Sequence, residues 1–294
     1  MEKINFENIT IDKISLPAFR EKQVESSVLR LDKIHPVISG NKWFKLRFYL
    51  EEAKRLQKKT IVTFGGAYSN HIVATAAASR LNDIKSIGII RGEEPGILSP
   101  TLLQAKEFGM QLIFVSRENY KEKKIWNSLL TSGNFIIDEG GYGEKGAEGA
   151  ATILDHCKKE DFTHICCAVG TGTMLAGLTR ASSNEQSLIG ISVLKNNLEI
   201  DENVWALSDK NNFKIVHDYH FGGYAKHKPE LIQFMNEFYT QTNIPSDFVY
   251  TGKLFFAVND LIKKNYFPVE SKLLVIHSGG LQGNASLEKG MLIF

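Results

Sequence analysis

The sequence predicts an α/β fold with largely parallel strands. Strand-like apolar runs alternate with helix-like segments along almost the whole chain, a pattern typical of parallel sheets whose strands are connected by helices. Three of these runs are followed by glycine-rich turns that begin near residues 65, 170 and 279. The composition, with 43% hydrophobic and 23% charged residues among 294, indicates a globular protein of one large domain or two smaller ones.

Hydrophobic periodicity places the expected elements along the chain. Strands are expected at residues 61–64, 86–90, 111–115, 135–138, 163–169, 188–193 and 272–277. Helices are expected at residues 41–56, 69–80, 101–108, 120–130, 150–158, 173–181, 229–239 and 254–264. The glycine-rich stretch 140–149 is expected to connect two lobes. In open α/β sheets ligands bind at the carboxyl ends of strands, so the three glycine-rich turns predict a ligand cleft.

Charge and cysteine content argue against several classes of protein. A formal net charge of +2 is too small to favour a nucleic-acid partner. Cys157, Cys166 and Cys167 contain no Cys-x-x-Cys pair, and the two adjacent cysteines should face opposite sides of a strand. The N-terminus lacks the apolar core of a signal peptide, and no apolar run is long enough to span a bilayer. We therefore expect a cytoplasmic protein without a membrane partner.

The loop Gly170-Thr171-Gly172-Thr173 lies between an expected buried strand and an expected helix. Glycines let the backbone turn sharply and present several N–H groups to an anion, and the helix N-terminus adds partial positive charge. A phosphate monoester is a suitable ligand, although a tight structural turn explains the same residues. The loop lacks the Gly-Lys-Ser/Thr ending of a P-loop, and its glycine spacing does not match a dinucleotide fingerprint.

A second segment, Ser39-Gly40-Asn41-Lys42, precedes an amphipathic helical pattern. A lysine ammonium at the positive end of a helix is disfavoured, so the pKa of Lys42 should fall, which suits Schiff-base formation with a carbonyl cofactor. By itself the segment also fits a surface lysine. Farther along the chain, the pair His217 and His220, with Asp218, resembles a metal cluster only superficially, and we expect no metal site there.

The segments containing Lys42, Ser69-Asn70-His71 and the 170–173 loop occur in the same order as in fold-type II, tryptophan synthase β-like enzymes that use pyridoxal 5′-phosphate. The chain most resembles the family of 1-aminocyclopropane-1-carboxylate deaminase and D-cysteine desulfhydrase. That resemblance implies a homodimer with two mainly parallel α/β lobes and the cofactor between them. It implies a larger cofactor-binding domain of residues 1–46 and 152–294, with a smaller domain of residues 47–151 inserted in it.

The resemblance also implies roles for individual residues. Lys42 matches the lysine that binds the cofactor covalently, and Asn70 matches the asparagine that binds its 3′-oxygen. The 170–173 loop matches the phosphate site. Ser69 matches a serine beside the substrate carboxylate that can act as a nucleophile. Tyr224 and Tyr250 match two active-site tyrosines, although amphipathic core positions would explain tyrosine there too. His71 could contact cofactor or substrate, or make only structural hydrogen bonds.

The residue after the second tyrosine predicts the substrate. By the resemblance, glutamate at this position is typical of the cyclopropane-carboxylate deaminase and threonine of the desulfhydrase. This chain has Thr251 there, and Thr251 or Ser278 would give the pyridine nitrogen a hydroxyl partner. We expect β-elimination from D-cysteine or a related small amino acid, giving a 2-oxo acid, ammonia and sulfide. Deamination of 1-aminocyclopropane-1-carboxylate and a non-catalytic binding protein are the alternatives.

Overall fold

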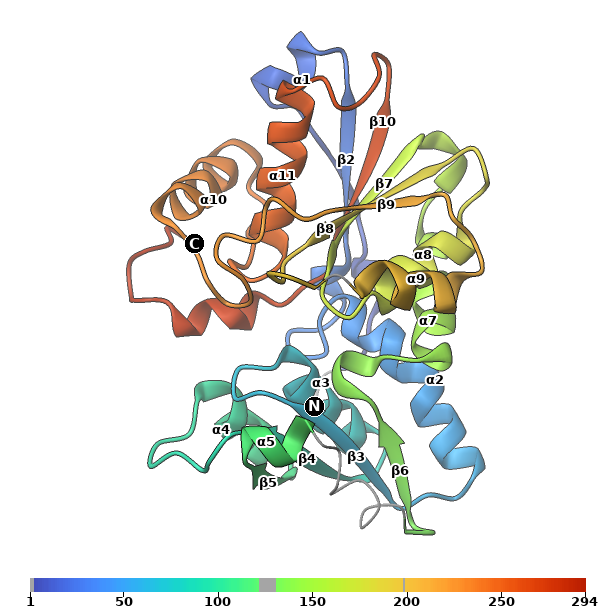
Figure 1. The fold of residues 1–294 in the computed structure, drawn as a ribbon, viewed down its shortest axis with the longest axis vertical. Helices are drawn as coiled ribbons and strands as arrows, with labels where there is room; N and C mark the ends of the chain where they lie inside the picture. The colour runs from blue at the N-terminus through green and yellow to red at the C-terminus, as the bar shows by residue number, and fades with distance from the viewer. Residues whose placement is uncertain (1–2, 122–130, 198) are drawn as a thin grey trace.

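The computed structural model describes residues 3–121, 131–197 and 199–294. The strands in this part of the chain form two sheets, a larger one at the top of Figure 1 and a smaller one at the bottom. Helices flank both sheets, so the α/β fold with two mainly parallel sheets is confirmed. None of the described helices is long and apolar enough to cross a membrane.

The larger sheet has six strands in the order β1-β2-β10-β7-β8-β9. These strands are β1 (Ile11–Ile14), β2 (Glu25–Arg30), β7 (His164–Val169), β8 (Ser187–Ser192), β9 (Phe213–Val216) and β10 (Lys272–His277). Only β1 and β2 pair antiparallel among the described strands of this sheet; the others pair in parallel. Cys166 and Cys167 on β7 pack into the core clusters on opposite faces, as predicted.

The smaller sheet has four parallel strands in the order β5-β4-β3-β6. They are β3 (Thr60–Gly65), β4 (Lys85–Arg91), β5 (Gln111–Val115) and β6 (Asn134–Ile137). The alanine-rich helix α3 (Asn70–Leu81) is almost wholly buried and packs on this sheet and on α4 (Pro100–Glu107). Small side chains on α3 allow this close packing, which fixes the start of the helix beside the end of β3.

The remaining described helices belong mainly to the larger sheet. They are α1 (Pro17–Glu21), α7 (Glu144–Ala151), α8 (Thr173–Ala181), α9 (Ile200–Ser208), α10 (Pro229–Thr242) and α11 (Thr251–Lys263), whereas α5 (Arg117–Lys121) follows β5 of the smaller sheet. In Figure 1, α10 and α11 lie on one side of the larger sheet and α7, α8 and α9 on the other. Each face is therefore covered, as a parallel sheet requires.

Helix α2 (Asn41–Arg55) belongs to both cores. Phe44 near its start packs into a core of the larger sheet, and Leu46 and Leu50 pack into a core of the smaller one. The helix thus joins the two sheets rather than lying on either. The predicted boundary between residues 46 and 47 falls inside α2, and the division into two domains stays a prediction.

The glycine-rich stretch 140–149, expected to connect two lobes, runs between β6 of the smaller sheet and β7 of the larger one and contains a helix. Residues 144–151 form α7, which packs against α2 and α8. A Cβ on Gly149 would lie 1.9 Å from the carbonyl oxygen of Phe44, and one on Gly146 would lie 2.1 Å from that of Gly141. These glycines therefore allow close backbone packing. The α-helix predicted at 150–158 was wrong, because α7 ends at Ala151 and a short 3-10 helix (Thr152–His156) follows.

Other predicted elements match the structure to within a few residues, including the strand at 272–277 and the helix at 173–181. The helix predicted at 120–130 falls mostly outside the described residues. Strands β1, β2 and β9 and helices α1 and α9 were not predicted.

The packing of α7 on α2 yields a stability prediction. Gly149→Ala should lower the free energy of unfolding by about 1–3 kcal/mol, the usual cost of overpacking, because the added methyl group meets a backbone carbonyl. Gly96→Ala is the matched control, since nothing lies within 4 Å of its added Cβ. Urea unfolding measures both, and equal midpoints for the two variants would contradict the prediction.

Candidate active site

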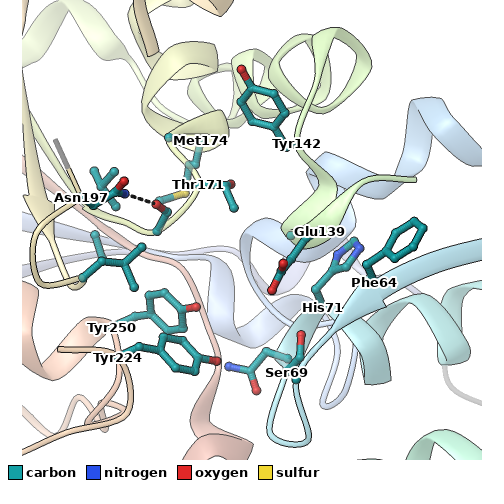
Figure 2. A pocket seen from close by; sticks show the side chains of 18 of the residues that line it. Phe64, Ser69, His71, Glu139, Tyr142, Thr171, Met174, Asn197, Tyr224 and Tyr250 are labelled. Carbon is teal, nitrogen blue, oxygen red and sulfur yellow. Dashed lines mark hydrogen bonds between the residues drawn. The ribbon is translucent and has the colours of Figure 1, made fainter. Parts of the chain in front are cut away.

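A cleft of about 1020 Å³ lies where the carboxyl ends of the parallel strands of both sheets meet. Its lining comes from the start of α2, the turn between β3 and α3, the loop between β7 and α8, and the segments before α11 and after β10. Figure 2 shows Tyr224 and Tyr250 on one side of this cleft, with Ser69, His71 and Glu139 on the other. The predicted ligand cleft is therefore built from segments distant in sequence.

Lys42 lies at the start of α2 and lines the cleft. Its Nζ donates a hydrogen bond to Oδ1 of Asn41 (2.8 Å) and lies 5.6 Å from the ring centroid of Tyr250. Burial lowers the pKa of Lys42 to about 8, although the charge of Asp247 acts in the opposite direction. A lysine in this state can supply an uncharged, nucleophilic amine near neutral pH.

Lys45 is a second cleft lysine, which the sequence analysis missed. It lies one turn after Lys42 and is only 5% exposed. Burial lowers the pKa of Lys45 well below its usual value, and the charge of Lys42 lowers it further. Within the described part of the chain no carboxylate lies within ion-pair distance of it. A buried amine whose protonated form has no acidic partner suits an anionic ligand, because the ligand's charge favours protonation. The spacing of three residues on one helix face could have revealed Lys45.

The 170–173 loop connects β7 to α8 beside these lysines. Gly170, Thr171 and Gly172 line the cleft, whereas Thr173 is fully buried and joins the loop through a 3.0 Å hydroxyl contact with Thr171. Gly172 has a φ of +83°, and an added Cβ would lie 2.8 Å from a methyl carbon of Val204. The loop therefore needs glycine there, and the amides at the start of α8 can hold an anion.

Ser69 and Asn70 lie at the N-terminus of α3. The Ser69 hydroxyl accepts a hydrogen bond from the amide of Ile72, which caps the helix. Asn70 is 5% exposed, and its Oδ1 has no hydrogen-bond partner among the described residues. Its Nδ2 lies 2.8 Å from where a Cβ on Gly280 would be, so glycine at 280 leaves room for the amide. Both residues face the cleft, and Asn70 has bonding capacity left for a ligand.

His71 combines a structural hydrogen bond with a free acceptor. The Thr63 hydroxyl donates its only proton to the carbonyl oxygen of Ile137 (2.8 Å), so it must accept from Nε2–H of His71, also at 2.8 Å. Nδ1 therefore carries a lone pair, and it is buried without a partner among the described residues. Burial and the charges of Lys45 and Lys42 hold the pKa of His71 well below its usual value.

The two tyrosines meet edge to face above Lys42. Their ring centroids are 6.1 Å apart and their planes are inclined by 71°. Burial raises the pKa of both hydroxyls, and the neighbouring Tyr224 adds to the increase for Tyr250. Both hydroxyls are therefore protonated near neutral pH. Tyr250 also packs against apolar core residues, so its ring has a structural role as well.

The structure does not bring Thr251 into the cleft. Its hydroxyl donates to Oδ1 of Asp247 (2.7 Å) and accepts from the Asp247 amide (2.8 Å), so its only proton is already engaged. Asp247 is fully buried and also accepts from the amides at 249, 250 and 251. Ser278, at the end of β10, does line the cleft. Position in the motif could not reveal this difference, because it depends on how α11 begins.

The mouth of the cleft carries charged residues that sequence reasoning also missed. The hydroxyl of Tyr120 donates to Oε2 of Glu139 (3.0 Å), and the guanidinium carbon of Arg91 lies 5.7 Å from the Tyr120 ring centroid. No group of three or more metal-ligating side chains occurs among the described residues. His217 instead lies 3.6 Å from Asp201 at the surface.

Comparisons with known proteins agree with this geometry. The family model described as "Pyridoxal-phosphate dependent enzyme" matches residues 12–279. A putative 1-aminocyclopropane-1-carboxylate deaminase of Pyrococcus abyssi is 31% identical over 290 residues, covering 90% of this chain and 87% of the relative. The chain belongs to the 1-aminocyclopropane-1-carboxylate deaminase and D-cysteine desulfhydrase family of pyridoxal-phosphate-dependent enzymes.

Two further members of the comparison support the assignment. A mitochondrial bifunctional D-cysteine desulfhydrase/1-aminocyclopropane-1-carboxylate deaminase of Arabidopsis thaliana is 28% identical over 282 residues, covering 84% of this chain and 70% of the relative. The crystal structure of a homologue of 1-aminocyclopropane-1-carboxylate deaminase superimposes with a TM-score of 0.81 at 28% identity, covering 94% of this chain and 90% of that one. The chain therefore has the fold-type II architecture of this family.

The cleft residues fit pyridoxal phosphate. Lys42 would supply the amine for the covalent link, and Lys45 with the amides of the 170–173 loop would supply positive charge for the phosphate. The unpaired side-chain atoms of Asn70 and His71 leave bonding capacity for polar ring substituents or for a substrate. Each end of the cofactor thus has a matching group.

The Lys45 amine, which has no carboxylate at ion-pair distance among the described residues, yields the second prediction. Lys45→Met should weaken the binding of pyridoxal phosphate to the apo-enzyme about 10- to 100-fold, because a hydrogen bond to a charged group contributes about 1.5–3 kcal/mol. Lys54→Met, an exposed position on the same helix, is the control. Titration of apo-enzyme by absorbance measures the affinity, and an unchanged Kd for Lys45→Met would rule out this role.

The lowered pKa of Lys42 yields the third prediction. Only the uncharged amine reacts, so the rate of covalent cofactor attachment to apo-enzyme should rise with pH and level off above about 8. An ordinary lysine would give a rate that keeps rising toward about pH 10.4. Stopped-flow absorbance follows the attachment, with Lys42→Ala as the blank. A rate still increasing above pH 10 would contradict the prediction.

Proposed function

We propose that the protein is a lyase that eliminates the β-substituent of a small amino acid, with D-cysteine or a close analogue as substrate. The products would be a 2-oxo acid and ammonia, with sulfide when the substrate is a thiol. The observation that carries the proposal is the side chain at the end of β10: the cleft has the Ser278 hydroxyl there. Asp247, a buried carboxylate, already accepts hydrogen bonds from the amides at 249, 250 and 251 and from the Thr251 hydroxyl.

Pyridoxal phosphate supplies an electron sink that stabilises negative charge at the substrate α-carbon. A neutral hydroxyl beside its ring nitrogen, rather than a carboxylate, would leave that nitrogen unprotonated more often, which moderates the sink. We propose Ser278 for this position. Gly170, Thr171 and Gly172, with the amide of Thr173, would hold the phosphate, and Thr251 would act only through Asp247 and the start of α11.

The chain's own groups account for the proton transfers. The Lys42 amine can remove the α-proton, because its pKa of about 8 leaves a useful uncharged fraction near neutral pH. The N–H groups at the start of α3, beside Ser69 and Asn70, can bind the substrate carboxylate. Tyr224 and Tyr250 keep their protons near neutral pH and can donate one to a leaving thiolate as the carbon–sulfur bond breaks. Nδ1 of His71 can accept a hydrogen bond from the substrate.

Deamination of 1-aminocyclopropane-1-carboxylate is the second candidate, favoured by the names of the similar proteins. That substrate has no hydrogen on its α-carbon, so a base cannot start the reaction as in elimination. Ring opening needs a nucleophile or a base at another carbon, and Ser69 is the hydroxyl placed to act. The two candidates therefore make different demands on Lys42 and Ser69.

A substrate panel gives the fourth prediction and tests the proposal. Holoenzyme should form pyruvate and sulfide from D-cysteine and pyruvate from β-chloro-D-alanine, with much slower product formation from L-cysteine, D-serine or 1-aminocyclopropane-1-carboxylate. Lys42→Ala should abolish the reaction, since it removes the base and the cofactor link, and Lys54→Ala should not change it. A preference for the cyclopropane substrate, measured as 2-oxobutyrate, would favour the second candidate and contradict the first.

The proposal includes two features of the whole molecule. A homodimer is expected from the resemblance, and light scattering of the purified protein measures it. A cytoplasmic location is expected from the sequence, and fractionation of cells tests it.

A further inference from the structure

Lys253 is a fully buried lysine that the proposed reaction does not use. It lies in the first turn of α11 and is 0% exposed. Its Nζ donates hydrogen bonds to the carbonyl oxygens of His220 (2.9 Å) and Gly223 (2.8 Å). Across the described ranges of the chain, no carboxylate lies within 4.0 Å of this ammonium. A buried charge held by two carbonyls is costly, so its position calls for an explanation.

The segment that Lys253 holds has an unusual backbone. Phe221 and Ala225 have φ values of +52° and +51°, and Gly222 and Gly223 have values of +99° and +118°. Residues other than glycine are strained in this region, and such a conformation persists only where surrounding contacts enforce it. Four left-handed residues thus surround Tyr224, and the turn depends on what holds it.

The two carbonyls that bind Lys253 are also the carbonyls that close this turn. The His220 carbonyl accepts from the amide of Gly223 (3.0 Å), and the Gly223 carbonyl accepts from the amide of Lys226 (3.2 Å). The ammonium therefore donates to the closing carbonyl of both turns, 220–223 and 223–226. Removing it would take a charge-assisted bond from each of these carbonyls.

Lys253 also lies on the element that positions the other active-site tyrosine. Tyr250 is the N-cap residue of α11, and Lys253 follows it in the same turn. Tyr224, at 39% exposure, reaches the cleft from the strained segment and meets the Tyr250 ring edge to face. We propose that Lys253 is a positioning residue that holds Tyr224 in register with Tyr250. This inference rests on the proposed function only in giving Tyr224 a role in the reaction.

A double-mutant cycle and hydrogen exchange test the proposal on the holoenzyme. In Lys253→Met the amides of Gly223 and Lys226 should exchange roughly 10-fold faster or more, because both closing carbonyls lose a bond to a charged group. The absorbance of the bound cofactor should be retained. The kcat of Lys253→Met should fall by roughly the same factor as that of Tyr224→Phe. The kcat of the double variant should be less than about 2-fold below that of Tyr224→Phe alone.

Two further variants keep the test decisive. Lys263→Met, an exposed position on the same helix, should change neither exchange nor kcat. If Lys253→Met does not fold, Lys253→Gln retains a hydrogen-bond donor without the charge and should show a smaller effect in the same direction. Either of two results would overturn the proposal. One is unchanged amide exchange at Gly223 and Lys226 in Lys253→Met. The other is that Lys253→Met lowers kcat by the same factor in Tyr224→Phe as in the unmodified enzyme. An enzyme inactive on every substrate would sink the proposed function alone, because the exchange measurement is independent of activity.

Discussion

The position of Lys42 depends on a close contact between two backbone segments. Gly40, with a φ of +60°, lies so near the end of β10 that an added Cβ would be 1.9 Å from the carbonyl oxygen of Ser278. The amide of Asn41 donates to that same carbonyl (3.2 Å). Any side chain at residue 40 would push the start of α2 away from the sheet. The contact therefore fixes the position of Lys42 relative to Ser278 in the cleft.

From that contact the rest of the site follows through α2. The helix begins beside the larger sheet at Lys42, places Lys45 in the same cleft as the 170–173 loop, and packs into the core of the smaller sheet. Glycines in α7 and α8 let these helices approach α2 and one another closely. The phosphate loop, the lysines and the start of α3 are thus held by helix packing, and the side chains that act on ligands remain on short, well-supported turns.

Much of this arrangement could be predicted from the sequence, because it depends on local patterns. Strand-turn-helix units with glycine at the turn predicted the cleft, and Lys42, Asn70 and residues 170–172 all line it. The strand β2 was missed because it includes Glu25, Ser26, Ser27 and Arg30, which read as polar surface. Arg30 is only 5% exposed, and its charge is neutralised by ion pairs with Asp32 on the following turn and with Asp12 on the neighbouring strand β1. Such compensation is invisible without the fold, as are the orientations of Thr251 and Lys253.

The two lysines on α2 have a consequence for folding as well as for chemistry. Burial lowers the pKa of both lysines, the charge of Lys42 lowers that of Lys45 further, and neither has a carboxylate at ion-pair distance among the described residues. In the folded protein without its cofactor, burial therefore disfavours the protonated form of both amines. A bound phosphate dianion would offset that penalty only in the folded state, so cofactor binding and folding are thermodynamically linked. The free energy of unfolding should therefore increase with the concentration of free pyridoxal phosphate.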